Sequence, residues 1–291
     1  MGGNIVRSLM RKGWTVYGYD PSAATMKVLR AEGMREAMSP SLLAGALEAP
    51  RTVWLMIPAG KIVDDTLFGK DGIVAHMSKG DVIIDGGNSF YEDSIERSKK
   101  IAKRGIRFVD VGFSGGPAGA LDGGCLMIGG DEGAFRTHEE LFADLSVPNG
   151  YQFFKGAGAG HFVKMLHNGI EYGMMQSLAE GFAVLKKSKY KLDLARVADI
   201  YNHKSVIESR LVGWMKGAFE KYGTDLKKVS GTVGHTGEGK WTVKSAKKMG
   251  VSVRAIEGAY KFRLESEKKP SYTGKLLSAL RNQFGGHSTH G

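Results

Sequence analysis

A lysine, a histidine, an amide and a carboxylate recur at helical spacing within residues 156–172. Lys164, His167, Asn168 and Glu171 occupy positions i, i+3, i+4 and i+7, so they share one side of a helix. Together they supply a base, an acid and positioning donors, which is what proton-transfer chemistry requires. The alternative interpretation is a solvated helix face that carries a Lys–Glu pair.

The same stretch also carries an apolar pattern. Val163, Leu166, Ile170 and Met174 recur at helical spacing, and we expect them to face a core. A run of small residues, 156–160, leads into the helix.

The elements that must position this helix are strands alternating with helices. Strands are predicted at 14–20, 52–57, 82–85 and 106–111, with shorter ones at 125–128 and 151–154. This alternation favours an α/β fold, a doubly wound Rossmann-like sheet that is mostly parallel. After Gly156 only helical periodicity remains, as far as Phe284. We therefore predict a dinucleotide-binding domain over 1–155 and an all-helical substrate and dimerisation domain over 156–291.

Half of a dinucleotide fingerprint is visible. Asp20 ends a predicted strand, where an acid binds the ribose hydroxyls and repels a 2′-phosphate, which favours NAD over NADP. A turn or N-cap aspartate before Pro21 is the alternative. The Gly-x-Gly-x-x-Gly pattern is not in this sequence; Gly2 would be its last glycine. We expect the first strand and the first two glycines to precede Met1, in a gene product that begins upstream.

Composition narrows the class of protein. The chain has 291 residues and a net charge of +11, from 41 Lys+Arg against 30 Asp+Glu. These basic residues are scattered, which favours a small anionic ligand over nucleic acid. A single cysteine, Cys125, and the lack of a membrane-spanning apolar run favour a cytoplasmic protein. No cluster of ligands predicts a metal.

Several motifs together resemble the 6-phosphogluconate dehydrogenase family, in its short, NAD-preferring form. Those near the start are Met1-Gly2-Gly3-Asn4, Asp85-Gly86-Gly87-Asn88-Ser89 and Phe113-Ser114-Gly115-Gly116. Later come Lys164-x-x-His167-Asn168-x-x-Glu171-Tyr172, Gly239-Lys240-Trp241-Thr242 and 281–287, Arg-Asn-Gln-Phe-Gly-Gly-His. The match covers the whole chain in family order.

The resemblance implies oxidative decarboxylation of 6-phosphogluconate to ribulose 5-phosphate and CO₂, within the pentose phosphate pathway or gluconate use. Lys164 would be the base, Glu171 the acid that protonates the enediol, and His167 and Asn168 would orient hydroxyls. Lys164 must be neutral to act, so its pKa must fall. The carboxylate end would be held by Asn88, which also lies near the cofactor, and by Ser114, Gly115 and Gly116.

The resemblance further implies a phosphate end made of Tyr172, Lys240, Thr242, Arg263, Arg281 and His287. It also implies a homodimer or higher homo-oligomer in which the tail carrying Arg281 and His287 completes the neighbour's site. Two alternatives remain. One is a related β-hydroxyacid dehydrogenase, acting on 3-hydroxyisobutyrate or tartronate semialdehyde, which should lack the phosphate-end motifs. The other is a catalytically silent basic paralogue.

Overall fold

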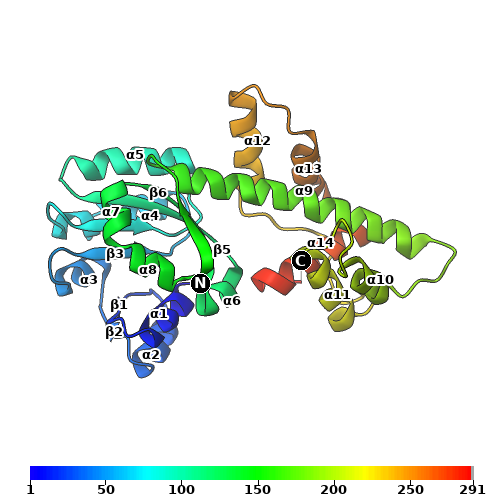
Figure 1. The fold of residues 1–291 in the computed structure, drawn as a ribbon, viewed down its shortest axis with the longest axis horizontal. Helices are drawn as coiled ribbons and strands as arrows, with labels where there is room; N and C mark the ends of the chain where they lie inside the picture. The colour runs from blue at the N-terminus through cyan, green and yellow to red at the C-terminus, as the bar shows by residue number, and fades with distance from the viewer. Residues whose placement is uncertain (290–291) are drawn as a thin grey trace. The chain divides into compact units, whose positions relative to one another are not determined.

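The computed structural model describes residues 1–289, which divide into two compact units. The first ends at Met165 and the second begins at Leu166, inside a continuous helix. The units are drawn in sequence colours in Figure 1. Within the described part of the chain, no helix is long and apolar enough to cross a membrane.

The strands of the first unit form two sheets. One is a parallel pair, β1 (Tyr17–Gly18) with β2 (Arg35–Glu36). The other has five strands in sequence order: β3 (Thr52–Leu55), β4 (Val82–Asp85), β5 (Arg107–Ser114), β6 (Gly124–Gly130) and β7 (Ser146–Phe153). All its neighbours are parallel except β5 and β6. The expected α/β class is confirmed.

Two details of the sheet differ from the sequence prediction. The strand expected at 14–20 shrinks to Tyr17–Gly18, because in the described chain it pairs only with β2 and not with the larger sheet. β5 and β6 run antiparallel because only residues 115–123 connect them, and a parallel crossover needs a dozen residues or more.

Helices cover both faces of the five-stranded sheet (Figure 1). They are α1 (Gly2–Arg11), α3 (Pro40–Ala46), α4 (Lys61–Phe68), α5 (Tyr91–Ala102), α6 (Gly116–Asp122), α7 (Glu132–Thr137) and α8 (Glu139–Asp144), with a 3₁₀ turn at Ile73–His76. A further helix, α2 (Ala23–Ala31), packs on α1 instead, in a small core of its own. Successive strand residues alternate between two cores: Val82 and Ile84 join one, and Ile83 joins the other. The sheet is therefore buried on both faces, as parallel sheets require.

The second unit contains only helices among its described residues. After α9 (Ala159–Lys187) come α10 (Leu194–Tyr201), α11 (Arg210–Tyr222), α12 (Glu238–Lys248), α13 (Arg254–Ser266) and α14 (Tyr272–Gly285). Its core joins Met175 and Phe182 of α9 to apolar side chains of α10, α11 and α14. The all-helical character predicted for this region is confirmed.

The long helix α9 buries a different face from the one predicted. Ile170 is 56% exposed and Met174 45%, whereas Lys164 is 8% exposed and Tyr172 5%. The prediction that Ile170 and Met174 face a core is therefore wrong within a single chain. Lys164 packs on Gly112 and Tyr172 packs on Gly239, whereas His167, Asn168 and Glu171 are half-buried.

Candidate functional site

The loop after β4 is built by a buried carboxylate and two glycines. Asp85, fully buried, accepts hydrogen bonds from the Gly87 N–H (3.1 Å) and from Ser89 Oγ (2.8 Å). A Cβ on Gly87 would lie 2.7 Å from the Ile57 carbonyl oxygen, so the loop demands glycine there. Asn88 is consequently presented, exposed, beyond the carboxyl end of β4, where ligands bind in such sheets.

The loop after β5 turns through left-handed backbone. Gly115 has φ +136° and Gly116 φ +64°, conformations that glycine adopts without strain. Ser114 ends β5 and is half-buried. The loop is tied to α1, because Asn4 Nδ2 donates to the Pro117 carbonyl oxygen at 2.8 Å. Residues 114–116 therefore form a fixed turn at the same sheet edge as Asn88.

Lys164 lies in the first turns of α9, which pack closely against β5. A Cβ on Gly112 would lie 2.2 Å from Lys164 Cβ, and one on Gly160 would lie 2.6 Å from the Asp110 carbonyl oxygen. The carboxylate of Asp110 accepts hydrogen bonds from the N–H groups of Gly158 (2.7 Å) and His161 (2.9 Å). The first turn of α9 is thus fixed on β5, and with it the root of Lys164.

On the following turns, the polar side chains bind one another. His167 Nδ1 lies 3.0 Å from Asn168 Oδ1 and 3.9 Å from Glu171 Oε2. Asn168 Nδ2 donates to Glu238 Oε1 at 3.3 Å. Because its oxygen and its nitrogen both have partners, the orientation of the Asn168 amide is fixed. Glu238 was not predicted from sequence; its one signal is an acid between two glycines, 237 and 239.

Tyr172, Arg263 and Arg281 form a buried cationic cluster in the second unit. The Arg263 guanidinium lies 3.3 Å from the centroid of the Tyr172 ring, and it donates to the Gly234 carbonyl oxygen at 3.5 Å. Arg263 is 2% exposed and Arg281 9%. A Cβ on Gly234 would lie 3.1 Å from Arg281 Nη1, so both guanidiniums approach the same glycine.

The electrostatics of this cluster match those of an anion site. Burial, the largest cause, and the charge of Arg281 together lower the pKa of Arg263 to about 10. Burial also lowers the pKa of Arg281, and it raises the pKa of Tyr172. Within residues 1–289, neither arginine makes an ion pair with a carboxylate. Two buried cations in one cluster are costly, and a bound anion would lower that cost.

The remaining residues predicted for the phosphate end differ in their burial. Thr242 is fully buried against Gly169 of α9. Lys240 is exposed on α12, and it is not among the charges that shift the pKa values of Arg263 and Arg281. His287 is half-buried, and burial together with the charge of Arg281 lowers its pKa, which favours the neutral imidazole.

The described part of the tail contacts residues of its own chain, and the prediction that it also completes a neighbour's site stays a prediction. Asn282 Nδ2 donates to the His287 carbonyl oxygen at 2.8 Å, and the Ser230 N–H donates to that of Thr289 at 2.7 Å. The physical reason is the apolar face of α14, whose leucines 276, 277 and 280 are fully buried in the unit's own core.

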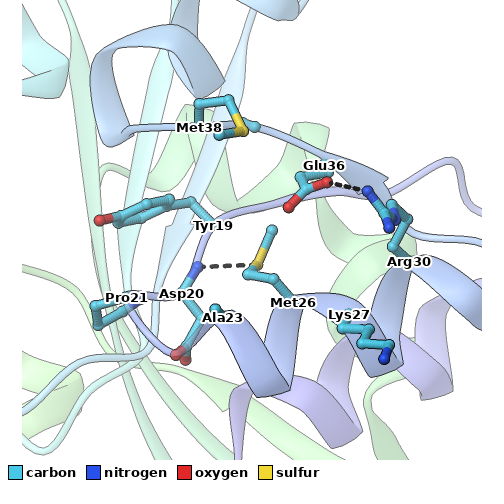
Figure 2. A pocket seen from close by; sticks show the side chains of 10 residues that line it. Tyr19, Asp20, Pro21, Ala23, Met26, Lys27, Arg30, Glu36 and Met38 are labelled. Atoms are coloured by element: carbon cyan, nitrogen blue, oxygen red, sulfur yellow. Dashed lines mark hydrogen bonds and ion pairs between the residues drawn. The ribbon is translucent and has the colours of Figure 1, made fainter.

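A pocket of about 400 Å³ lies beside the end of β1. Figure 2 shows Tyr19, Met26 and Met38 around it, with Glu36 turned toward Arg30. Asp20 lines the pocket, and its Oδ1 accepts from the Ser22 N–H at 2.8 Å. Asp20 therefore does act as a turn aspartate, and the same hydrogen bond holds its carboxylate at the pocket. Gly2, at the start of α1, would place a Cβ 3.6 Å from Met56, an ordinary contact that does not require glycine.

The fold, the polar residues of α9 and the cationic cluster of Tyr172, Arg263 and Arg281 define the class of protein. A Rossmann-like unit joined to a helical unit through a lysine-bearing helix is an oxidoreductase architecture with a dinucleotide-binding domain. Residues 1–153 match the family model described as the NAD binding domain of 6-phosphogluconate dehydrogenase, and residues 160–282 match that of the 6-phosphogluconate dehydrogenase C-terminal domain. The chain belongs to the decarboxylating 6-phosphogluconate dehydrogenase family.

Relatives of similar length support this assignment. The YqeC protein of Bacillus subtilis is 42% identical over 99% of this chain and 96% of its own. The NAD(+)-dependent, decarboxylating 6-phosphogluconate dehydrogenase of Haloferax volcanii is 36% identical over 99% and 94%. Among solved structures, the Plasmodium falciparum 6-phosphogluconate dehydrogenase, studied with NADP⁺ and with 6-phosphogluconate, is 28% identical, with a TM-score of 0.78 over 96% of this chain and 68% of that one.

Proposed function

We propose that this chain oxidises and decarboxylates 6-phosphogluconate to ribulose 5-phosphate and CO₂, as part of gluconate or pentose phosphate metabolism. One observation carries the proposal: α9 bears both Lys164 and, two turns further on, Tyr172, which packs under Arg263. A sugar acid with a phosphate at one end needs a base for its hydroxyl and buried guanidiniums for its phosphate.

The residues divide the chemistry as follows. Lys164, neutral before reaction, takes the proton of the C3 hydroxyl, while a bound dinucleotide supplies the hydride acceptor. The resulting 3-keto acid releases CO₂, and the ammonium of Lys164 stabilises the enolate oxygen that forms. Glu171, as the carboxylic acid, then protonates C1. His167 and Asn168 orient the hydroxyls, and Asn88 with Ser114, Gly115 and Gly116 holds the carboxylate before it leaves.

Replacement of Lys164 tests this proposal. We expect Lys164→Met to lower kcat by about 10²–10⁴-fold, the usual cost of losing a general base, with the Tm close to wild type. Lys187→Met, an exposed lysine on the same helix, is the matched control. The measurement is NADH formation and CO₂ release from 6-phosphogluconate. Near-normal turnover by Lys164→Met would rule out its role.

The phosphate end also separates this function from the related β-hydroxyacid dehydrogenases. Arg263 and Arg281 have no purpose for an uncharged 3-hydroxyisobutyrate tail. We therefore expect kcat/KM for 6-phosphogluconate to exceed that for 3-hydroxyisobutyrate and tartronate semialdehyde, and Arg281→Ala to remove most of the difference. A chain that turned over none of these substrates would be the catalytically silent paralogue.

We further propose that NAD is preferred to NADP. The support is Asp20, whose carboxylate is fixed at the pocket beside β1 and would repel a 2′-phosphate. The nearby cation Arg30 is already paired with Glu36 at 3.0 Å. We expect a higher kcat/KM with NAD, and a smaller NAD-to-NADP ratio in Asp20→Ser, measured with both cofactors at saturating substrate. A higher kcat/KM with NADP in the wild type would contradict this reading of Asp20.

A homodimer or higher homo-oligomer is proposed as well. The support is a stripe on α9, at positions 170, 174, 177, 181 and 184, in which Ile170, Met174 and Val184 are 56%, 45% and 72% exposed. Large apolar side chains aligned on one helix face are typical of a surface that binds another chain. A sedimenting species of single-chain mass at assay concentration would contradict the proposal.

A further inference from the structure

Glu238 is a buried acid beside the cationic cluster, and the proposed function gives it no task. It is the first residue of α12 and is 4% exposed. Its two carboxylate oxygens have separate partners: Oε1 accepts from Asn168 Nδ2 at 3.3 Å, and Oε2 accepts from Thr236 Oγ1 at 2.7 Å. A carboxylate next to a site for an anion opposes that anion, so its presence there needs an explanation.

The position of Glu238 is fixed by its neighbours. A Cβ on Gly239, the next residue, would lie 2.6 Å from Tyr172 Cε2, so the first turn of α12 packs directly on the tyrosine ring. The same ring carries the Arg263 guanidinium 3.3 Å from its centroid. The backbone of Glu238 is therefore held beside Tyr172, and its carboxylate is held by Asn168 and Thr236.

Its charge acts on the whole cluster. The Glu238 carboxylate raises the pKa values of four groups. For Arg263, Arg281 and His287 it opposes the larger effect of burial, and for Tyr172 it adds to that effect. For the two arginines, this offsets part of the penalty of holding two buried cations together. A bound phosphate would compete with Glu238 for the same positive charge.

We propose that Glu238 is a positioning residue with two linked tasks: it is the counter-charge of Arg263 and Arg281 until an anion binds, and it fixes the amide of Asn168. Affinity for the phosphate group is lower than the arginines alone would give, in exchange for a cluster that is assembled before substrate arrives. The second task rests on the proposed function, because Asn168 orients the substrate there; the first concerns anion binding alone.

Two substitutions separate the tasks. Glu238→Gln removes the charge but keeps an oxygen that can accept from Asn168, whereas Glu238→Ala removes both. We expect both variants to bind inorganic phosphate about three- to tenfold more tightly than wild type, because one anion has left the cluster. We expect kcat to stay within about threefold in Glu238→Gln and to fall about tenfold or more in Glu238→Ala, where the Asn168 amide loses its partner.

Inorganic phosphate is the probe, and its dissociation constant is measured by calorimetry on the full chain. Glu257→Gln is the matched control, since it changes the net charge equally in the same unit, at a carboxylate that meets Lys247 at 3.3 Å and Lys261 at 3.1 Å. We expect its affinity for phosphate to stay at the wild-type value. Arg281→Ala should abolish phosphate binding, which would show that the titration reports binding to this cluster.

An acid that only favours the helix N-terminus would give a different result. Glu238→Gln would then lower the Tm without tightening phosphate binding. If Glu238→Gln binds phosphate no more tightly than Glu257→Gln does, the counter-charge role is overturned. Full kcat in Glu238→Ala overturns the link to Asn168. If the wild type fails to oxidise 6-phosphogluconate, the proposed function fails, and the phosphate titrations still decide the role of the charge.

Discussion

At the scale of the residue, two buried aspartates show how hydrogen-bond and ion-pair partners set the pKa of a buried carboxylate. Asp81 and Asp110 are both nearly inaccessible, and each accepts two backbone N–H hydrogen bonds. Asp81 also has Arg51 Nη1 at 3.1 Å. Burial raises the pKa of Asp110 despite the opposing charge of His161. For Asp81 burial acts in the same direction, but bonds from Ser78 and Arg51 outweigh it and lower its pKa.

These opposite shifts predict opposite pH dependences of stability. Asp81, with a native pKa below the unfolded value of about 3.9, stabilises the fold above that value, and the gain is lost as pH falls. Asp110, with a raised native pKa, favours the fold most below the unfolded value and less as pH rises. We expect the Tm advantage of wild type over Asp81→Asn to grow from about pH 3 to about pH 6, and that over Asp110→Asn to shrink.

The measurement is the Tm of wild type and both variants across that range, with each variant serving as the control for the other. Curves that moved in the same direction would show that the surroundings of Asp110 stabilise its carboxylate.

Sequence reasoning at this scale found residues that stand in recurring motifs and missed those that act through tertiary contact. Asp20, Asn88, Lys164 and Arg281 were proposed from strand ends, helical spacing and motif context. Glu238 was missed because an acid at a helix start is ordinary, and only the fold places Asn168 beside it.

At the scale of the element, α9 depends on close backbone packing against the sheet. Gly112 in β5 and Gly160 in α9 leave no room for a Cβ: the first would meet the Lys164 side chain and the second the Asp110 carbonyl oxygen. Helix and strand therefore fix the lysine between them. The approach is this close because both residues lack side chains.

A methyl group at Gly112 should therefore disturb catalysis more than a methyl group elsewhere. Its Cβ would lie 2.2 Å from Lys164 Cβ, so Gly112→Ala must shift the start of α9. We expect kcat to fall by about tenfold or more, because displacements of about 1 Å at a reacting group cost that much. Gly258→Ala in α13, where nothing lies within 4 Å, is the matched control and should gain about 0.5–1 kcal/mol.

Steady-state kinetics and thermal unfolding of both variants check this prediction. Unchanged kcat in a folded Gly112→Ala chain would mean that α9 tolerates the shift and that Lys164 is placed by other contacts.

The sequence identified α9 as a helix and located its polar side, but not which side is buried. Hydrophobic periodicity assigns apolar residues to the interior, and it fails where the interior holds a polar site. Lys164 and Tyr172 are therefore buried while Ile170 and Met174 are exposed. The same limit applies to β1, since strand length depends on a pairing partner that local composition does not reveal.

At the scale of the whole molecule, the chain combines a dinucleotide-type sheet with a helical unit through one continuous helix. The order of these parts was predictable, because the change from strand to helix periodicity occurs once along the chain. The position of the tail was not. The buried leucines of α14 anchor this helix in the core of its own unit, and the site that Arg281 serves is open to direct test.

The predicted contribution of the tail to a neighbour's site is tested by mixing two inactive chains. If Arg281 crosses to the neighbour, a dimer of one Lys164→Met chain and one Arg281→Ala chain carries one intact site. Equal mixing then leaves about a quarter of all sites intact. We expect recovery of 6-phosphogluconate oxidation toward that level, with heterodimers demonstrated by co-purification through different tags. Wild type mixed with Lys164→Met is the control and should keep activity in proportion to the wild-type chain. No recovery would assign Arg281 to the site of its own chain, where its charge shifts the pKa of Tyr172.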